Sequence, residues 1–174
     1  WVPSASKLLN DKGGVKRWEK LWPIWLQQLL LTLSGHPVAV SVLCPLGVIH
    51  WAPVELADAQ IYWREIVQAW RDGQDHALAF DVGVATAYLT KPTARNKDKD
   101  QTLACELAAR EAYQGSEFGD SNFAPITKPP MAMLWPDYAA LSASNELALY
   151  RDSLVSAMIY HIEPERREWV ESSL

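Results

Sequence analysis

Few residues of this sequence have the types and spacing that catalysis requires. No two of the four histidines lie four residues apart, and none joins a cysteine at a zinc-binding spacing. Neither a phosphate loop (Gly-x-x-x-x-Gly-Lys) nor a nucleophile elbow (Gly-x-Ser-x-Gly) occurs. We therefore predict no catalytic residue and no metal ligand. The histidines are His36, His50, His76 and His161.

The two cysteines, Cys44 and Cys105, lie far apart in the sequence and have no neighbouring base. We expect both thiols to be small core side chains of a reduced, cytoplasmic protein. His50, between Ile49 and Trp51, is expected to be the outward residue of a strand.

One pair of carboxylates, Asp98 and Asp100, has the alternate spacing of some metal sites. Both lie in the segment Lys91–Asp100, whose composition predicts an exposed loop. Carboxylates interleaved with lysines are typical of a solvated surface. We therefore expect this loop to hold no cation.

Basic residues form two groups that suit contact with nucleic acid. One group lies near the N-terminus beside Trp18 and Trp22, and the other lies in the 91–100 loop. Basic side chains with neighbouring aromatic rings can follow a single strand, where stacking contributes about 1–3 kcal/mol per base. The alternative is an ordinary set of surface lysines, with both tryptophans in the core. The candidate DNA-binding residues are Lys16, Arg17, Lys91, Arg95, Lys97 and Lys99.

The composition narrows the class of protein. The 174 residues, 49% of them hydrophobic and 21% charged, suffice for a globular domain with a core. The formal net charge is −5, whereas domains that grip duplex DNA usually carry a basic surplus. The nine tryptophans suit a core or a protein interface. These totals favour a protein-contacting role, and apolar runs shorter than ~20 residues predict no membrane contact.

The elements that would position these residues follow from apolar spacing. The first third predicts helical structure over 16–33 that ends at Ser34-Gly35. Pro23 either marks the first turn of a helix, so that Lys16–Trp22 is a separate piece, or kinks one longer helix. A hairpin of Val38–Cys44 and Val48–Trp51 around Pro45-Leu-Gly47 follows. The predicted buried stripe of the helix is Trp18, Trp22, Trp25, Leu29 and Leu33.

The next segment predicts a helix from about Glu55 to Asp72, with Gly73 at its C′ position. Leu78–Phe80 then suits either a third strand, with a helix over Val84–Leu89, or an all-helical segment. The predicted buried stripe of the first helix is Leu56, Trp63, Ile66, Val67 and Trp70.

The last third begins with a predicted helix, Gln101–Tyr113, in which Glu106 and Arg110 form an ion pair. Prolines within 115–143 exclude long regular elements, and Met131–Trp135 is expected to fill the core. A final helix from about Asn145 to Ile162 would bury Leu147, Leu154 and Met158 on one face.

This order of segments resembles the C-terminal region of the exonuclease V gamma chain family, the RecC subunit of RecBCD helicase-nucleases, from roughly Val15 to Ile162. The resemblance rests on Trp70-Arg-Asp-Gly73, Leu78-Ala-Phe80, Thr86-Ala-Tyr88-Leu89, Ala109-Arg110-Glu-Ala-Tyr-Gln-Gly115, Gly119-Asp120 and Leu134-Trp135-Pro-Asp137.

The resemblance implies an α/β (α+β) fold, a small sheet with flanking helices, related to the PD-(D/E)XK (restriction endonuclease-like) nucleases but without catalytic function. An active member needs an Asp on one strand and a Glu-x-Lys on the next to hold its cations, and no Glu-x-Lys occurs here.

As partners the resemblance implies the beta and alpha chains of the complex, which use ATP and Mg, and DNA reached through that complex. No cofactor is expected in this domain, and the location would be cytoplasmic. The expected role is subunit assembly in DNA end processing and recombinational repair, by an enzyme that has a subunit that recognises Chi sequences.

We expect a single domain over 1–174, with an N-terminal loop (1–14), a nuclease-like core (15–163) and a tail (164–174). Because the first residue is Trp1, we expect a piece of a longer chain. Two alternatives are an active metal-dependent PD-(D/E)XK nuclease with a divergent motif and an unrelated protein-interaction adaptor.

Overall fold

The computed structural model describes residues 2–4, 6–9, 15, 17–91, 101–115 and 124–162. The chain divides into two compact units, one made of Trp1–Gln68 with Ala157–Leu174 and the other of Ala69–Ser156. Helix α2 (Leu56–Asp75) begins in the first unit and ends in the second.

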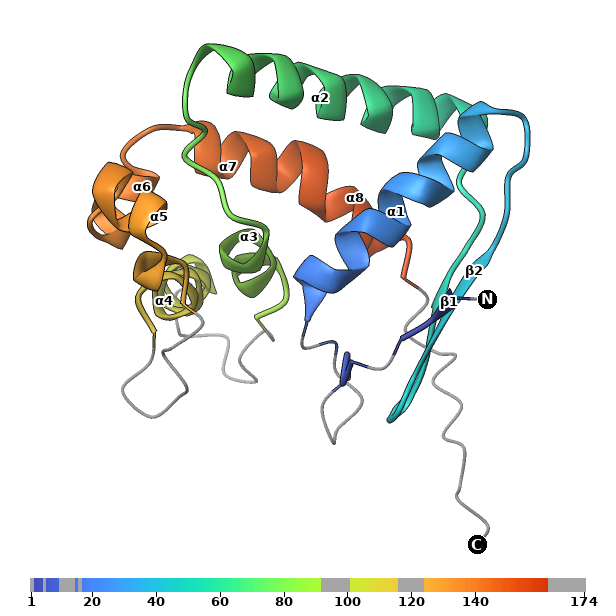
Figure 1. Ribbon diagram of the computed structural model, residues 1–174, viewed down its shortest axis with the longest axis horizontal. Helices are drawn as coiled ribbons and strands as arrows, with labels where there is room; N and C mark the ends of the chain where they lie inside the picture. Colours follow the sequence, from blue (N-terminus) through green and yellow to red (C-terminus); the bar gives the residue numbers. More distant parts are fainter. Residues whose placement is uncertain are drawn as a thin grey trace, which may run out of the picture. The chain divides into compact units, whose positions relative to one another are not determined.

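A small sheet organises the first unit. Strands β2 (Val40–Cys44) and β3 (Gly47–Trp51) pair antiparallel around a two-residue turn, as predicted (Figure 1). Strand β1 (Val2–Pro3) pairs with β2 in parallel. The expectation that all of residues 1–14 form a loop is therefore wrong at this strand, since two residues are too short to show a period-two pattern.

The register of the hairpin separates its two faces. Val42 lies opposite Ile49, and Val40 lies opposite Trp51; all four side chains are buried. Because side chains alternate along a strand, these four share the core face. His50, on the other face, is half-buried and its Nδ1 lies 2.9 Å from the Ser41 hydroxyl.

Helix α1 (Trp18–Leu33) is a single helix that contains Pro23 at an exposed position. It ends where the sequence predicts. Gly35 adopts a φ of +88°, and the amide of His36 donates to the Leu31 carbonyl at 2.9 Å. A left-handed glycine with this hydrogen bond is the Schellman end of a helix.

Helix α2 extends to Asp75, so the prediction that Gly73 ends it is wrong. The predicted buried stripe is also wrong in part, because Leu56 and Trp70 are 48% and 65% exposed. The helix buries Ala59 and Ala69 instead. The other three residues of the predicted stripe, Trp63, Ile66 and Val67, are half-buried. The helical period was therefore right, and only the first and last positions of the stripe were misplaced.

The second unit is made of short helices that lie together in Figure 1. The longest of these, α4, agrees with its predicted bounds to within one residue, and the short elements after it agree with the excess of prolines. The elements are α3 (Val82–Leu89), α4 (Gln101–Gln114), the 3-10 turn η2 (Pro125–Thr127), α5 (Pro129–Leu134), α6 (Tyr138–Ser142) and α7 (Glu146–Tyr150).

The predicted third strand at Leu78–Phe80 does not form. The amide of Phe80 donates to the Leu78 carbonyl at 2.8 Å, which closes a three-residue turn. The side chain of Asp81 then caps α3, accepting from the Val84 amide at 3.0 Å. The capping bond marks Asp81 as the residue before the first turn of α3. Because α3 spans Val82–Leu89, the predicted helix in this segment is confirmed.

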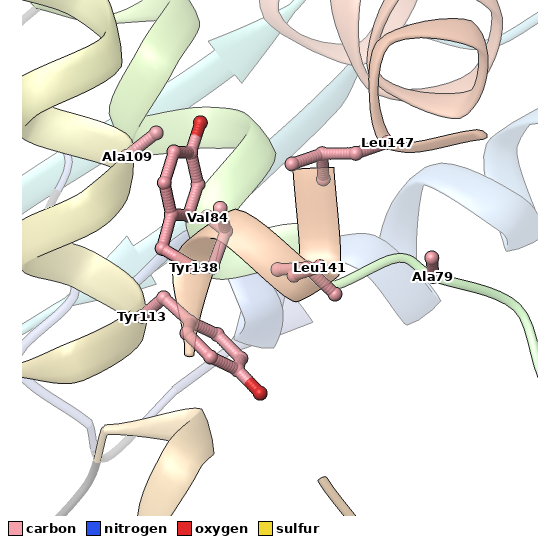
Figure 2. Close-up of a cluster of buried hydrophobic side chains, with 7 residues drawn as sticks. All are labelled: Ala79, Val84, Ala109, Tyr113, Tyr138, Leu141 and Leu147. Carbon is pink, nitrogen blue, oxygen red and sulfur yellow. The ribbon is translucent and has the colours of Figure 1, made fainter. Parts of the chain in front are cut away.

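The core of the second unit joins α3, α4, α6 and α7 (Figure 2). Met131 and Trp135 pack against it, but Met133 is 84% exposed, so Met131–Trp135 fills the core only in part. The predicted Glu106–Arg110 pair is replaced by Arg110 donating to Gln114 at 2.9 Å. The core residues are Ala79, Val84, Ala109, Tyr113, Tyr138, Leu141 and Leu147.

The final predicted helix is present as three consecutive pieces, α7, a π-helical turn η3 (Arg151–Val155) and α8 (Ser156–Tyr160). Leu147, Leu154 and Met158 are buried as expected. The π turn was not predicted, since it inserts one residue into the helical repeat without a sequence signal.

The fold is therefore a mixed α/β arrangement with a small sheet, as expected. Along the described ranges, no helix is both long enough and apolar enough to cross a membrane.

Candidate functional site

The candidate DNA-binding residues are only partly within the described chain. Arg17 and Lys91 are exposed. The guanidinium of Arg17 lies 4.0 Å from the Glu19 carboxylate. Lys16, Arg95, Lys97 and Lys99 lie outside the described residues, as do the carboxylates of Asp98 and Asp100.

Metal-binding side chains do not gather in the part of the chain that the structure describes. No group of three or more His, Cys, Asp or Glu there is arranged to hold a metal ion. Cys105 is buried, and Cys44 is half-buried with its sulfur 3.2 Å from the Gly47 carbonyl oxygen.

An open cavity of about 90 Å³ lies in the second unit. Helices α3, α4, α6 and α7 all contribute to its wall, together with the start of η3. Its apolar lining includes Ala85, Ala109 and Leu147, and its polar lining includes Glu106 and Arg151. The remaining lining residues are Val84, Tyr88, Tyr138, Ser142, Ser144, Asn145 and Ala148.

The first polar feature of the cavity is the contact between Tyr138 and Glu106. The Tyr138 hydroxyl donates to Glu106 Oε2 at 2.6 Å. Burial and this hydrogen bond raise the pKa of Tyr138 far above its ordinary value. Figure 2 shows the Tyr138 ring beside Ala109, with its hydroxyl pointing away from that of Tyr113. Tyr138 is therefore a neutral donor that orients one oxygen of Glu106.

The second polar feature is Arg151. Its Nε and one Nη donate to the two carboxylate oxygens of Asp152 at 2.7 and 2.9 Å. Its guanidinium carbon lies 3.9 Å from the centre of the Tyr88 ring, a cation–π geometry. The hydrogen bonds to Asp152 raise the pKa of Arg151. The guanidinium is thus fixed in place, and its charge is balanced by its neighbour.

The size of the cavity limits what it can hold. The cavity, at about 90 Å³, is smaller than an engineered cavity of about 150 Å³ that binds benzene. Its volume suits several waters or one slender side chain in contact with both apolar and polar groups. Its lining combines apolar side chains with the polar groups of Glu106, Tyr138 and Arg151, an arrangement that can contact a ligand.

Sequence reasoning missed this cavity. The bond between Tyr138 and Glu106 joins residues 32 positions apart, which no local pattern reveals. One signal was present in α4. Glu106 shares a helix face with Ala109 and Tyr113, at i+3 and i+7, and both of those residues are buried. A carboxylate on a buried face indicates a partner or a pocket.

A second polar cluster in the same unit centres on Glu146. Its carboxylate accepts from the Ala79 amide at 2.9 Å and lies 2.5 Å from His76 Nε2. The hydrogen bond to Glu146 raises the pKa of His76. Burial raises the pKa of Glu146, but the Ala79 amide and His76 outweigh this effect and lower it. The cluster connects the start of α7 to the segment between α2 and α3.

Several large apolar side chains remain exposed in the described chain. Leu103 and Leu107, one turn apart on α4, are 58% and 48% exposed, while Trp70 lies near the end of α2. Exposed apolar residues in a group mark contact surfaces, and tryptophan is enriched at protein interfaces. The exposure of Trp70 shows that the expectation of a buried Trp70 is wrong.

Comparison with known proteins gives a match to one family model and no match to an individual curated protein. The family model for the RecC C-terminal domain matches residues 3–93. The matched range includes α1, the hairpin, α2 and α3, and it covers more than half of the 174 residues. No individual curated protein matches the sequence. The chain therefore belongs to the RecC C-terminal domain family.

Proposed function

We propose that this domain is a non-catalytic part of the gamma subunit of a RecBCD-type helicase-nuclease. It would serve assembly of the enzyme, and through it DNA end processing and recombinational repair. The observation that carries the proposal is the match of residues 3–93 to the RecC C-terminal domain.

The absence of catalysis is supported by two observations. The sequence contains no Glu-x-Lys, and the described residues provide no cluster of metal ligands. A fold derived from the PD-(D/E)XK nucleases, with its cation site lost, agrees with both. The sheet observed among the described residues is small, and relation to that nuclease fold is part of the proposal.

The partners in this proposal are the beta and alpha chains, which would use ATP and Mg while this domain binds no cofactor of its own. DNA would be reached through the complex, in the cytoplasm. The two groups of basic residues, with Arg17 and Lys91 exposed, are the proposed points of contact with a single strand.

Protein contact is supported by the surface of α4. Leu103 and Leu107 present adjacent apolar side chains to solvent, next to the exposed Arg110. An apolar centre with a polar rim is the usual anatomy of a protein interface. The net charge of −5 agrees with this role better than with a grip on duplex DNA.

Co-purification of the full gamma chain with its beta and alpha chains tests the assembly role. Leu103→Gln together with Leu107→Gln should reduce recovery of the complex about tenfold, since truncating buried interface anchors costs about 1–2 kcal/mol or more. Glu111→Gln, on the same helix and equally exposed, is the control and should leave recovery unchanged. Normal recovery of the double variant would contradict this surface as the contact.

A digestion assay with Mg²⁺ or Mn²⁺ separates the proposal from an active nuclease. We expect the purified gamma chain to leave linear DNA intact. Cleavage that is lost in Asp98→Asn with Asp100→Asn would overturn the non-catalytic role and assign those carboxylates to a metal site.

A further inference from the structure

One polar group of the second-unit cavity keeps a hydrogen-bond acceptor that the other polar groups do not occupy. Glu106 Oε2 accepts from Tyr138, and no other hydrogen bond or ion pair reaches Glu106 within the described ranges. Its Oε1 is therefore an available acceptor at the edge of the cavity. A half-buried carboxylate with an unused oxygen favours a ligand that donates hydrogen bonds.

The net charge around the cavity is negative, like that of the Glu106 carboxylate. Arg151 is the basic group of the lining, and both oxygens of Asp152 hold it. The charge of Glu106 also acts on Arg151 and helps to raise its pKa. Two carboxylates, Glu106 and Asp152, thus face one guanidinium, and the three groups together carry a net formal charge of −1. The hydroxyls of Ser142 and Ser144 and the Asn145 carboxamide add further acceptors. The cavity thus complements a cation.

The apolar wall selects among cations. Ala85, Ala109 and Leu147 present methyl and isobutyl groups, which suit an aliphatic stem that is buried while its charged end reaches a polar edge. The cavity is smaller than a benzene site, which disfavours the planar fork of arginine. A lysine side chain has a slender stem and a compact ammonium with three donors.

We propose that this cavity binds a lysine side chain of a partner protein, with the ammonium on Glu106 Oε1 and the stem against the alanines of α3 and α4. The proposal rests on the assembly role proposed above, because the lysine would belong to another subunit. It adds a specific anchor to that role, distinct from Leu103 and Leu107.

Small probes test the cavity without any partner. The full gamma chain, labelled at alanine methyl groups, is titrated with Nα-acetyl-lysine methylamide, which keeps the side-chain ammonium. The methyl resonances of Ala85, Ala109 and Ala148 should shift together and saturate. The matched probe is N-acetyl-norleucine methylamide, which keeps the stem but lacks the ammonium, and it should bind about tenfold more weakly, as expected for loss of one charge-assisted hydrogen bond.

Substitutions test whether Glu106 binds the ammonium of the lysine probe. Glu106→Gln should weaken the lysine probe about tenfold and leave the norleucine probe unchanged, because glutamine still accepts from Tyr138. Glu111→Gln, exposed on the same helix, is the control and should have no effect. Ala148→Leu should fill the cavity and weaken both probes.

Several results would overturn the proposal. These are equal binding of the lysine and norleucine probes, tighter binding of an arginine probe, stronger shifts with deoxycytidine monophosphate, or no shifts at all. If Glu106→Gln fails to fold, the comparison of the two probes on the unchanged protein still decides. Failure here leaves the assembly role to be tested separately, by co-purification of the Leu103 and Leu107 variant.

Discussion

The side-chain amide of Gln28 donates to the carbonyl of Ala52 at 2.8 Å, across 24 residues of sequence. The same nitrogen donates to the Val38 carbonyl at 3.0 Å, and the side chain is fully buried. Val38 precedes β2 and Ala52 follows β3. One glutamine of α1 therefore satisfies the backbone at both ends of the hairpin.

Gln28→Leu should lower the free energy of unfolding by about 1–2 kcal/mol. Leucine fills similar space but leaves the Val38 and Ala52 carbonyls without a donor. The change also removes the Gln28 carbonyl oxygen, which has no partner among the described residues, and this keeps the cost moderate. Urea unfolding of the variant and of Gln27→Leu, its exposed neighbour, gives the comparison. Equal stability of the two would show that the amide bonds contribute nothing.

Replacing glycine by alanine should change the free energy of unfolding in opposite directions at two positions. Gly35 has a φ of +88°, so Gly35→Ala forces a strained backbone and should cost about 1 kcal/mol. Gly73 lies inside α2, and an added methyl group would meet Leu78 at 3.5 Å, an ordinary contact. Gly73→Ala should therefore stabilise the protein by about 0.5–1 kcal/mol. Thermal unfolding measures both, and effects of the same sign would contradict the two backbone assignments.

The contrast between Gly35 and Gly73 shows how far sequence reasoning reaches. The end of α1 and the hairpin turn are set by neighbouring residues, and both were predicted. At Gly73 the same signal was misleading, because one glycine is tolerated inside a helix, and α2 continues for two more residues to Asp75. Leu56 and Trp70 were misplaced since tertiary contacts, not side-chain size, fix which face of α2 is buried.

The polar contacts of the second unit were beyond sequence reasoning for a different reason. Glu146 bonds to the amide of Ala79 across 67 residues, and Tyr138 bonds to Glu106 across 32. Such pairs follow from the fold and leave no local period. The family resemblance did not supply them either, since neither Glu106 nor Glu146 belongs to the motifs that carried it.

The His76–Glu146 pair predicts a pH-dependent stability. The pKa of His76 is raised above 6.5, so its contribution is fully present below that pH and is lost as the pH rises through the folded-state pKa. The pKa of Glu146 is lowered below 4.5, so its contribution is present above that pH and is lost on further acidification. The pair is therefore most stabilising between pH 4.5 and 6.5.

His76→Gln should lower the melting temperature more at about pH 5.5 than at about pH 8, because the contribution of protonated His76 is lost as the pH rises through its folded-state pKa. Gln74→Ala, an exposed neighbour without a titratable group, should have the same effect at both. A His76→Gln effect that is independent of pH would show that the ion pair does not form in solution.

The second group of basic residues predicts a change in the salt dependence of DNA binding by the assembled enzyme. Lys91, Arg95, Lys97 and Lys99 replaced together by glutamine should weaken binding of a single strand, since each phosphate contact releases a counterion. The slope of log affinity against log salt should become less steep by up to about 3, at about 0.7 for each phosphate that is no longer neutralised. Lys128→Gln, at an exposed position outside both basic groups, is the control. An unchanged slope would place these four residues on an ordinary surface and leave DNA contact to the partner subunits.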